Sequence, residues 1–469
     1  MTDNLFEEMD RLFHPQNMAA VGAADRIGNM GISFLLGYQK CGFQGNLYAV
    51  NPKTKAKNFD TYDSVTDIPG PLDEVRVAVS AKFVPDVIRD CVKKGVRCVS
   101  IFTSGFRETG TDDGKAMESE IARIARKGGV RLIGPNCMGI LCPESGMSIR
   151  ADMPVMKDGS IGLISQSGGI AISLALACRE RELGLSKVVS YGNESDLGAP
   201  EFLYYLARDP KTSVICLYIE GTGRAEDLVA ALKDAAGKKP VIMVKGGMTD
   251  AGSRAATSHT GALTGASEIW NAIARQTGAT LVADTEEMLD LAMLFTLKGS
   301  PPGKNLGIIT ISGGFGVIAT DLVTKAGFDI PELAGQTQAA LEKFIDVPGT
   351  SIQNPVDMAA KFFNYQAFPE IFPAFDRDPN IDAFLMICAV EYLTFLSSQA
   401  DKFATFLVEA MIGAMDAMKK PTYVVLLHTI SEDIRLKQER FFIEKGYPVF
   451  PTVQRCLTAM NRANRNGQS

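Results

Sequence analysis

Histidine is scarce in this chain, with three residues among 469, and there is a single tryptophan. The nine cysteines are scattered, without a Cys-x-x-Cys pair and without the His/Cys spacing of a zinc site. This pattern argues against a disulfide framework and favours a reduced, cytoplasmic protein without a structural metal. No apolar run approaches the ~18–20 residues that cross a bilayer. The acidic opening "MTDNLFEEMDRLF" is neither a signal nor a transit peptide.

Basic charge is not in excess either. The net charge of −6 argues against nucleic acid as a partner. The composition, 46% hydrophobic and 22% charged, is that of an ordinary globular protein. At a length prior of ~150 residues per domain, we expect about three soluble domains and no contact with a membrane.

Short β-branched apolar runs alternate with amphipathic helical stretches along most of the chain. In the first 140 residues the candidate strands are "MAAVGA", "GNLYAVN", "VRVAVSA", "CVSIFTS" and "VRLIGPN". Such alternation predicts the α/β class, with doubly wound parallel sheets covered by helices.

Two junctions rich in proline and glycine, at 142–159 and 298–305, divide the pattern. They predict domains at 1–142, 143–298 and 299–469. The second and third domains both open with a strand, then serine and two glycines, then a helix. This similarity suggests a weak internal duplication of about 150 residues.

The first glycine loop, "VGAADRIGNMG", follows the first predicted strand and is not the Gly-x-Gly-x-x-Gly fingerprint. The second strand ends in "VNPK", where an NAD site would place an acidic residue. Lys53 indicates instead a phosphate-bearing nucleotide, either coenzyme A with its 3′-phosphate or NADP with its 2′-phosphate. The alternative is a simple tight turn of a doubly wound domain.

Two further glycine loops, "SQSGGIA" and "SGGFGV", open the second and third domains. A helix start leaves backbone N–H groups unpaired and attracts anions. Each loop alone is a weak signal, but two of them could converge on one phosphate. The candidate phosphate-binding residues are Ser165, Ser167, Gly168, Gly169, Gly313, Gly314 and Gly316.

His259 lies in "GSRAATSHTGALTG", residues 252–265, whose small residues predict a mobile, solvent-open loop. An ordinary imidazole pKa near 6.5 leaves it neutral and nucleophilic at cellular pH. A carboxylate that accepts its other N–H would fix the tautomer. Glu220, at the end of the predicted strand "ICLYIEG", is the best candidate for that carboxylate. The alternatives are an idle surface histidine and a solvated carboxylate.

These motifs, in this order, resemble the nucleoside-diphosphate-forming acyl-CoA synthetases, the superfamily that includes succinyl-CoA synthetase. "SRAATSHTGALTG" resembles the family's phosphohistidine loop, and "LIGPNCMGI" resembles part of its CoA-binding domain. "LISQSGGIA", "YGNESDLG" and "YIEG" resemble the ligase domain that follows, and "ITISGGFGV" with "NPVDM" resembles a third domain. The resemblance extends from about residue 10 to 455.

The resemblance implies a Rossmann-like CoA-binding domain followed by two flavodoxin-like doubly wound domains. It makes His259 the phosphorylated nucleophile, Glu220 its supporting carboxylate, and the two later glycine loops facing phosphate cradles. The implied coenzyme A contacts are Gly22, Ala23, Lys53, Thr103, Ser104, Gly105 and Asn136. Cys137 would lie near the coenzyme A thiol, although as a residue it is best interpreted as a small buried hydrophobe.

The resemblance further implies the α-type subunit of an ADP-forming acyl-CoA synthetase. Because the chain ends soon after the third domain, we expect ATP or ADP and Mg²⁺ to bind an ATP-grasp β subunit in an α2β2 assembly. Two alternatives remain open at this point: an NADP-linked oxidoreductase, and a non-catalytic coenzyme A-binding regulator of the same fold. The sequence does not identify the carboxylic acid or distinguish ADP from GDP.

Overall fold

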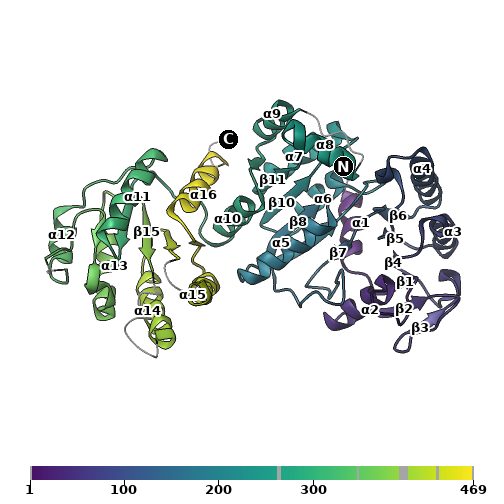
Figure 1. Ribbon diagram of the computed structural model, residues 1–469, viewed down its shortest axis with the longest axis horizontal. Helices are drawn as coiled ribbons and strands as arrows, with labels where there is room; N and C mark the ends of the chain where they lie inside the picture. The colour runs from purple at the N-terminus through teal and green to yellow at the C-terminus, as the bar shows by residue number, and fades with distance from the viewer. Residues whose placement is uncertain (1–2, 261–265, 346–347, 390–399, 429–431, 467–469) are drawn as a thin grey trace. The chain divides into compact units, whose positions relative to one another are not determined.

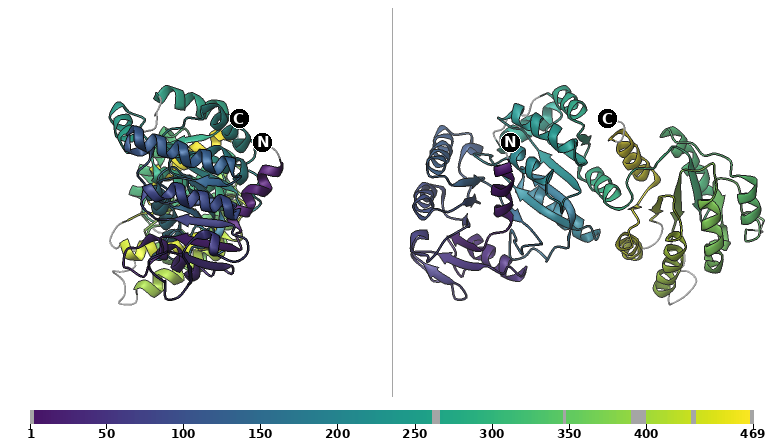
Figure 2. Two further views of the ribbon diagram at one scale, coloured as in Figure 1. Left: turned by 90° about the vertical axis from the view of Figure 1, so that its right-hand side faces the viewer. Right: turned by 180° about the vertical axis from the view of Figure 1, so that it is seen from behind.

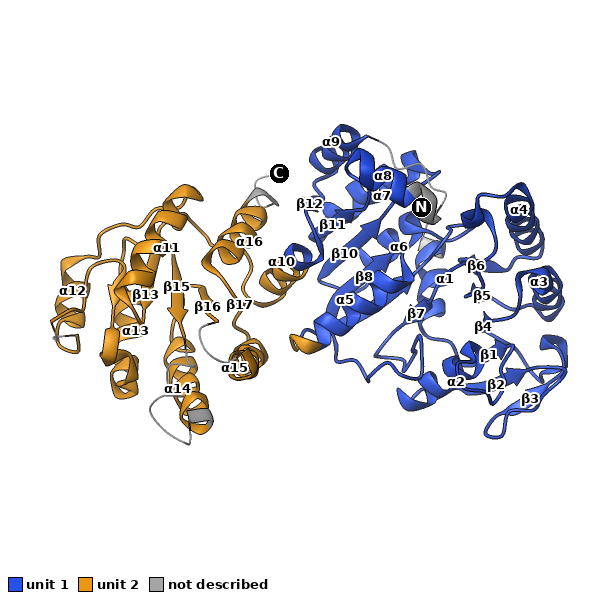
Figure 3. Ribbon diagram, in the orientation of Figure 1, with its two compact units in different colours: residues 1–179, 183–288 blue, residues 180–182, 289–469 orange. Residues whose placement is uncertain are grey.

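The computed structural model describes residues 3–260, 266–345, 348–389, 400–428 and 432–466 (Figures 1 and 2). Over these residues, the chain forms three mainly parallel sheets. It divides into two compact units, the first made of residues 1–179 and 183–288, the second of 180–182 and 289–469 (Figure 3). The first two sheets therefore share one unit.

The first sheet has the strand order β3-β2-β1-β4-β5-β6, which is the order of the classic Rossmann fold. Its strands are β1 (Asn17–Val21), β2 (Asn46–Val50), β3 (Asp60–Tyr62), β4 (Glu74–Val77), β5 (Cys98–Ile101) and β6 (Arg131–Ile133). Its helices are α2 (Met30–Lys40), α3 (Val84–Lys94) and α4 (Asp112–Lys127), with short 3₁₀ turns η1 (Val65–Asp67), η2 (Ala81–Phe83) and η3 (Arg107–Thr109). The helix ends follow local chemistry: α3 has proline in its first turn and ends at left-handed Gly95.

The second sheet has the order β12-β11-β10-β8-β9-β7. Without β7, which pairs antiparallel with β9, this is the flavodoxin-like order. The strands are β7 (Gly139–Leu141), β8 (Asp158–Ser165), β9 (Leu185–Ser190), β10 (Val214–Ile219), β11 (Val241–Lys245) and β12 (Thr280–Val282). The helices are α5 (Gly168–Glu180), α6 (Ala199–Leu206), α7 (Ala225–Ala236), α8 (Asp250–Thr260) and α9 (Ser267–Thr277). The next helix, α10 (Thr285–Leu297), contains the boundary between the two units, after residue 288.

The third sheet repeats the flavodoxin-like order as β14-β13-β15-β16-β17. Its strands are β13 (Leu306–Thr310), β14 (Val356–Asp357), β15 (Ala383–Cys388), β16 (Thr422–Leu426) and β17 (Val449–Phe450). Its helices are α11 (Gly313–Lys325), α12 (Gly335–Leu341), α13 (Phe368–Asp376), α14 (Ala400–Met415), α15 (Glu432–Glu444) and α16 (Val453–Asn466), with 3₁₀ turns η4 (Ala359–Phe363) and η5 (Tyr365–Ala367). Every residue of β13, β15 and β16 is buried, as expected for central parallel strands.

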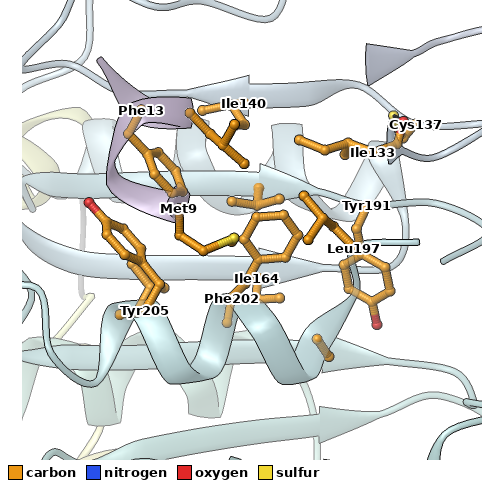
Figure 4. Close-up of a cluster of buried hydrophobic side chains, with 14 of the residues drawn as sticks. Met9, Phe13, Ile133, Cys137, Ile140, Ile164, Tyr191, Leu197, Phe202 and Tyr205 are labelled. Carbon is orange, nitrogen blue, oxygen red and sulfur yellow. Dashed lines mark hydrogen bonds between the residues drawn. The ribbon is translucent and has the colours of Figure 1, made fainter. Parts of the chain in front are cut away.

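One hydrophobic cluster explains why the first two sheets form a single unit. Buried residues from both sheets, including Met18 and Ile164, belong to the same core. The N-terminal helix α1 (Asp3–Phe13) adds Met9 and Phe13 to this core, beside residues of α6 (Figure 4). The rings of Phe13 and Tyr205 stack with centroids 4.7 Å apart.

The structure confirms the predicted fold class and every candidate strand quoted from the first 140 residues. The short strands β3 and β7 were not predicted from the sequence. The division into three domains at 142/143 and 298/299 stays a prediction. Among the described residues, no helix combines the length and apolar character that a membrane span requires.

Candidate functional site

A pocket of about 630 Å³ opens at the carboxyl ends of the first sheet's central strands. Its walls include Gly22 after β1, Asn51 and Lys53 after β2, and Ser80 after β4. Because β1 and β4 flank the point where the strand order reverses, this is where doubly wound sheets bind ligands. The sequence did not single out Asn51 or Ser80, nor Arg26, which also lines the pocket.

The backbone conformation and the close packing at position 22 both require a glycine. Its φ of +91° is left-handed, and a Cβ there would lie 2.5 Å from the carbonyl oxygen of Ala78. Among the other predicted coenzyme A contacts, Lys53 is exposed and lines the pocket, whereas Ala23 is buried and does not line it. The carbonyl of Ala23 accepts a hydrogen bond from the Asn51 side chain at 2.9 Å.

The stretch Thr103 to Gly105 follows β5 and lies outside the lining of the first pocket. Thr103 is buried, and its hydroxyl donates to the carbonyl of Val79 at 2.7 Å, which ties β5 to the pocket wall. Ser104 is exposed. The carbonyl of Thr103 also accepts the N–H of Asn136 at 3.0 Å, so this stretch supports a second pocket.

The second pocket, about 290 Å³, lies between the carboxyl ends of strands from both sheets of the first unit. It brings together several residues that the sequence predicted separately. Its lining residues are Phe102, Asn136, Cys137, Met138, Gln166, Ser167, Gly168, Gly169, Gly192 and Asn193. Predicted coenzyme A and phosphate contacts therefore share one cavity.

The loop before α5 is held by its own side chains. Ser165 is buried, its hydroxyl donates to the carbonyl of Ser167 at 2.7 Å, and it accepts the N–H of Ser167 at 3.2 Å. Ser165 thus shapes the loop, while Ser167 and the two glycines line the pocket. Gly168 lies against Met138, whose Cγ would be 2.8 Å from an added Cβ.

Glu220, immediately after β10, is buried rather than solvated. Its Oε1 accepts from the hydroxyl of Tyr218 at 3.2 Å. Burial, together with the Glu220 carboxylate, raises the pKa of Tyr218, so this hydroxyl stays protonated and donates. The loop that begins α5 is joined to Glu220, because Gln166 accepts the backbone N–H of Glu220.

Lys245, at the end of the neighbouring strand β11, is a residue that the sequence analysis missed. Its ammonium group is buried, donates to the carbonyl of Gly246, and lies 5.1 Å from the centroid of the Trp270 ring. Burial lowers the pKa of Lys245 to about 8, and the Glu220 carboxylate opposes this shift. A polar residue at the carboxyl end of a buried parallel strand was the available sequence signal.

The predicted loop at 252–265 is wrong over most of its length, because Asp250–Thr260 form helix α8. The reason is local: the Thr249 hydroxyl accepts the N–H of Gly252 at 3.1 Å, and alanines follow in the next turn. His259 is in the last turn of this helix, and its side chain lies outside the described residues, as do residues 261–265.

Helix α8 lies beside the 3₁₀ turn η3 of the first sheet. The Asn193 side chain donates to Glu108 of this turn at 2.6 Å and to Glu118 of α4 at 2.8 Å. Arg107 donates to the carbonyl of Asn193 and lies 3.3 Å from Glu118. This network joins the wall of the second pocket to the turn that α8 contacts.

The third-domain loop repeats the geometry of the loop before α5. The Thr310 hydroxyl donates to the carbonyl of Ser312 at 3.1 Å and accepts its N–H at 3.2 Å. Gly314 is exposed, whereas Gly316 is buried against Thr310 and Pro355. The two loops lie in different units, so their facing arrangement stays a prediction.

The carboxylate of Asp357 lies close to the start of α11, whereas no carboxylate among the described residues lines the pocket at the start of α5. An added Cβ on Gly313 would lie 2.7 Å from Oδ2 of Asp357, which follows from the "NPVDM" motif. A negative charge at this place competes with an incoming anion for the helix start. The start of α11 at Gly313 is therefore less favourable for an anion than the start of α5 at Gly168.

Cys137 is a buried thiol, as preferred from the sequence. Its Sγ lies 3.4 Å from the carbonyls of Ile101 and Ile133. Burial raises the pKa of Cys137 to about 12, so the thiolate is not populated at neutral pH. Within the described part of the chain, no three His, Cys, Asp or Glu side chains are grouped to hold a metal ion.

Comparisons with known proteins agree with this arrangement. Residues 16–143 match the family described as CoA binding domain, and residues 158–295 match the succinyl-CoA ligase like flavodoxin domain. The solved structure of dinucleotide-forming acetyl-coenzyme A synthetase 1 from Candidatus Korarchaeum cryptofilum, in complex with phosphate and ADP, is 27% identical. Its TM-score is 0.85, over 98% of this chain and 97% of that chain.

Two curated relatives are 35% identical to this chain. One is the ADP-forming acetate–CoA ligase I of Archaeoglobus fulgidus; the match covers 81% of this chain but 54% of the relative, so the chain spans about half of that protein. The other is the alpha subunit of the ADP-forming acetate–CoA ligase II of Pyrococcus furiosus, with 81% of this chain and 82% of the relative covered. On this similarity, the chain belongs to the family of ADP-forming acyl-CoA ligases, a group of acid–thiol ligases.

Proposed function

We propose that this chain is the α-type subunit of an ADP-forming acyl-CoA synthetase and carries its acyl-transfer and phosphohistidine chemistry. The observation that supports this most strongly is the second pocket. In it, the start of α5 and Asn136 share one cavity, and the backbone N–H of Glu220 is hydrogen-bonded to Gln166 in the loop that precedes α5. The site provides backbone N–H groups for an anion and a carboxylate for an imidazole.

The proposed reaction has three steps. An oxygen of inorganic phosphate attacks the thioester carbonyl carbon of acyl-CoA; the C–S bond breaks, and coenzyme A leaves and takes a proton. The neutral imidazole of His259 then attacks phosphorus, and the carboxylic acid leaves as its carboxylate. The phosphoryl group finally passes from His259 to ADP, which gives ATP and restores the imidazole.

The chain's own contribution to these steps is mainly electrostatic. The N–H groups of Ser167 to Gly169, at a helix start, stabilise negative charge on the phosphoryl oxygens without reorganising. Glu220 fixes the tautomer of His259 and stabilises the cationic phosphohistidine. Residues around the first pocket, Lys53 among them, hold the nucleotide end of coenzyme A. All three steps are reversible, so the same site can activate an acid.

The partner proposed for nucleotide binding is an ATP-grasp β subunit in an α2β2 assembly, with Mg²⁺ accompanying the nucleotide in the cytoplasm. The name of the Pyrococcus relative, a subunit alpha, supports a second chain. The Archaeoglobus relative, nearly twice as long as the aligned region, is consistent with a fusion of the two parts. The relatives' names make acetate the first acid to test.

The expected result of His259→Ala is complete loss of acid-labile phosphorylation and of acyl-CoA synthesis, with coenzyme A affinity retained. The reason is that the imidazole is the nucleophile, whereas the first pocket is separate from α8. His14→Ala is the matched control, since His14 contacts Asp10 and Glu144 outside both pockets. Labelled acetyl phosphate and acetyl-CoA would report the two activities, and undiminished turnover by His259→Ala would refute the mechanism.

Because the chain belongs to a ligase family, the alternative function of an NADP-linked oxidoreductase is excluded. The phosphorylation assay also separates the ligase from a coenzyme A-binding regulator. A regulator would bind coenzyme A and would incorporate no label at His259.

A further inference from the structure

Gln166 is a buried residue that lines the second pocket, and the mechanism above gives it no role. Its Oε1 accepts two backbone hydrogen bonds, from the N–H of Glu220 at 2.7 Å and from that of Gly221 at 3.1 Å. The backbone N–H of Gln166 donates to the carbonyl of Tyr218 at 3.0 Å. Gln166 is therefore fixed to the end of β10, the strand that carries Glu220.

The two hydrogen bonds to the side chain determine the orientation of the Gln166 amide. Only the amide oxygen can accept from two backbone N–H groups, so this position is Oε1 and the other is the Nε2 amino group. No described protein atom accepts a hydrogen bond from this Nε2, and Gln166 lines the pocket together with Ser167, Gly168 and Gly169. This Nε2 is not among the enclosed polar atoms that lack a partner, so it faces space in the pocket that a ligand oxygen can occupy.

The duplicated loop shows that a glutamine is not needed to form this turn. In the loop before α11, the same serine or threonine hydrogen bonds are present, and the equivalent position is the buried apolar residue Ile311. The backbone turn thus forms with isoleucine between the two hydroxyl residues. The turn therefore does not require a glutamine, and the Nε2 of Gln166 is available to a ligand while its Oε1 holds the end of β10.

We propose that Gln166 is an anion-binding residue of this site, whose Nε2 donates to an oxygen of inorganic phosphate and of the acyl phosphate. This inference rests on the proposed function. A neutral amide already fixed in orientation adds a hydrogen bond to the charged oxygen without reorganisation. Its Oε1 meanwhile fixes the position of the phosphate-binding loop relative to Glu220 at the end of β10.

Two substitutions separate the donor from the acceptor. Gln166→Glu keeps an oxygen for the N–H groups of Glu220 and Gly221 but replaces the donor with a negative oxygen. Gln166→Ile introduces the residue of the duplicated loop and removes both functions. The probe is inorganic phosphate, titrated calorimetrically into the full chain. Because hydrogen bonds to charged groups are strong, we expect Gln166→Ile to weaken phosphate binding about 10- to 100-fold, and Gln166→Glu to weaken it further.

The neutral variant Gln166→Ile decides the proposal, because the carboxylate of Gln166→Glu repels phosphate whatever the role of the amide. Wild-type phosphate binding by Gln166→Ile, or by Gln166→Glu, overturns the proposal. Unchanged coenzyme A affinity and far-ultraviolet circular dichroism show that each variant is folded. Labelling of His259 in the wild type is measured separately: its absence refutes the proposed function, whereas normal labelling with unaffected variants refutes only the role of Gln166.

Discussion

Three polar side chains are buried at the carboxyl ends of neighbouring strands in the second sheet: Gln166, Glu220 and Lys245. Burying polar and charged groups is costly unless each has a partner. Here the partners are local, because Gln166 accepts from the backbone of Glu220, and Lys245 donates to the carbonyl of Gly246. Such groups of buried polar residues at one edge of a sheet are typical of ligand sites, which is the physical basis for the site proposed here.

At the residue scale, the clearest prediction concerns Lys245. Burial lowers its pKa to about 8, whereas an unfolded lysine titrates at 10.5. Between these values the unfolded state binds more protons, so this residue makes the folded state more stable as pH rises from about 8 to 10.5. In NMR spectra of lysine-labelled protein, the amine signal missing from Lys245→Gln should titrate near pH 8 in the wild type.

The stability measurement provides a second check on Lys245. Lys245→Gln should flatten the rise in unfolding free energy across that pH window, and Lys53→Gln, at an exposed position, is the control. An amine signal that titrates near 10.5 would show that the burial of Lys245 does not act as described.

Among the elements, the turn from β1 to α2 contains two glycines with different surroundings, Gly22 and Gly28. Gly22→Ala places a methyl group against the Ala78 carbonyl in a left-handed backbone, whereas Gly28 has a similar φ of +77° and open space around it. We expect Gly22→Ala to lower stability by roughly 2 kcal/mol or more beyond Gly28→Ala, and to weaken coenzyme A binding. Thermal melts and coenzyme A titrations measure both effects, and equal behaviour of the two variants would contradict the geometry.

The elements that the sequence predicted well are those with a clear hydrophobic pattern. Buried strands such as β1 and β13 are continuous apolar runs, and the glycine loops follow them directly, so the fold class and the start of α5 were predictable. Helix α8 was missed because serine, threonine and glycine suggest a loop, while the cap from Thr249 becomes visible only in three dimensions. Gln166 and Lys245 were missed because their roles depend on the neighbouring strand, which one segment of sequence does not show.

For the whole molecule, the division into units carries its own prediction. Residues of the first and second sheets share one hydrophobic core, which α1 completes. Limited proteolysis should therefore leave residues 1–288 protected in one fragment and cut first beyond that boundary, within 298–305, where proline and glycine are concentrated. Mass spectrometry of the fragments would test this, and early cleavage near 142–159 would show that the first two sheets are separable.

The hydrophobic core shared by the first two sheets also constrains how a long ligand can reach both pockets. Both pockets belong to one packed body, so the span between them cannot be shortened by a hinge. A molecule anchored by its nucleotide end must carry its thioester to the reacting centre through rotations of its own flexible arm. On the proposed function, we expect anchoring strength and acid preference to be separate traits: changes around Lys53, in the first pocket, should alter how long the molecule stays, whereas changes in the second pocket should alter which acid it delivers.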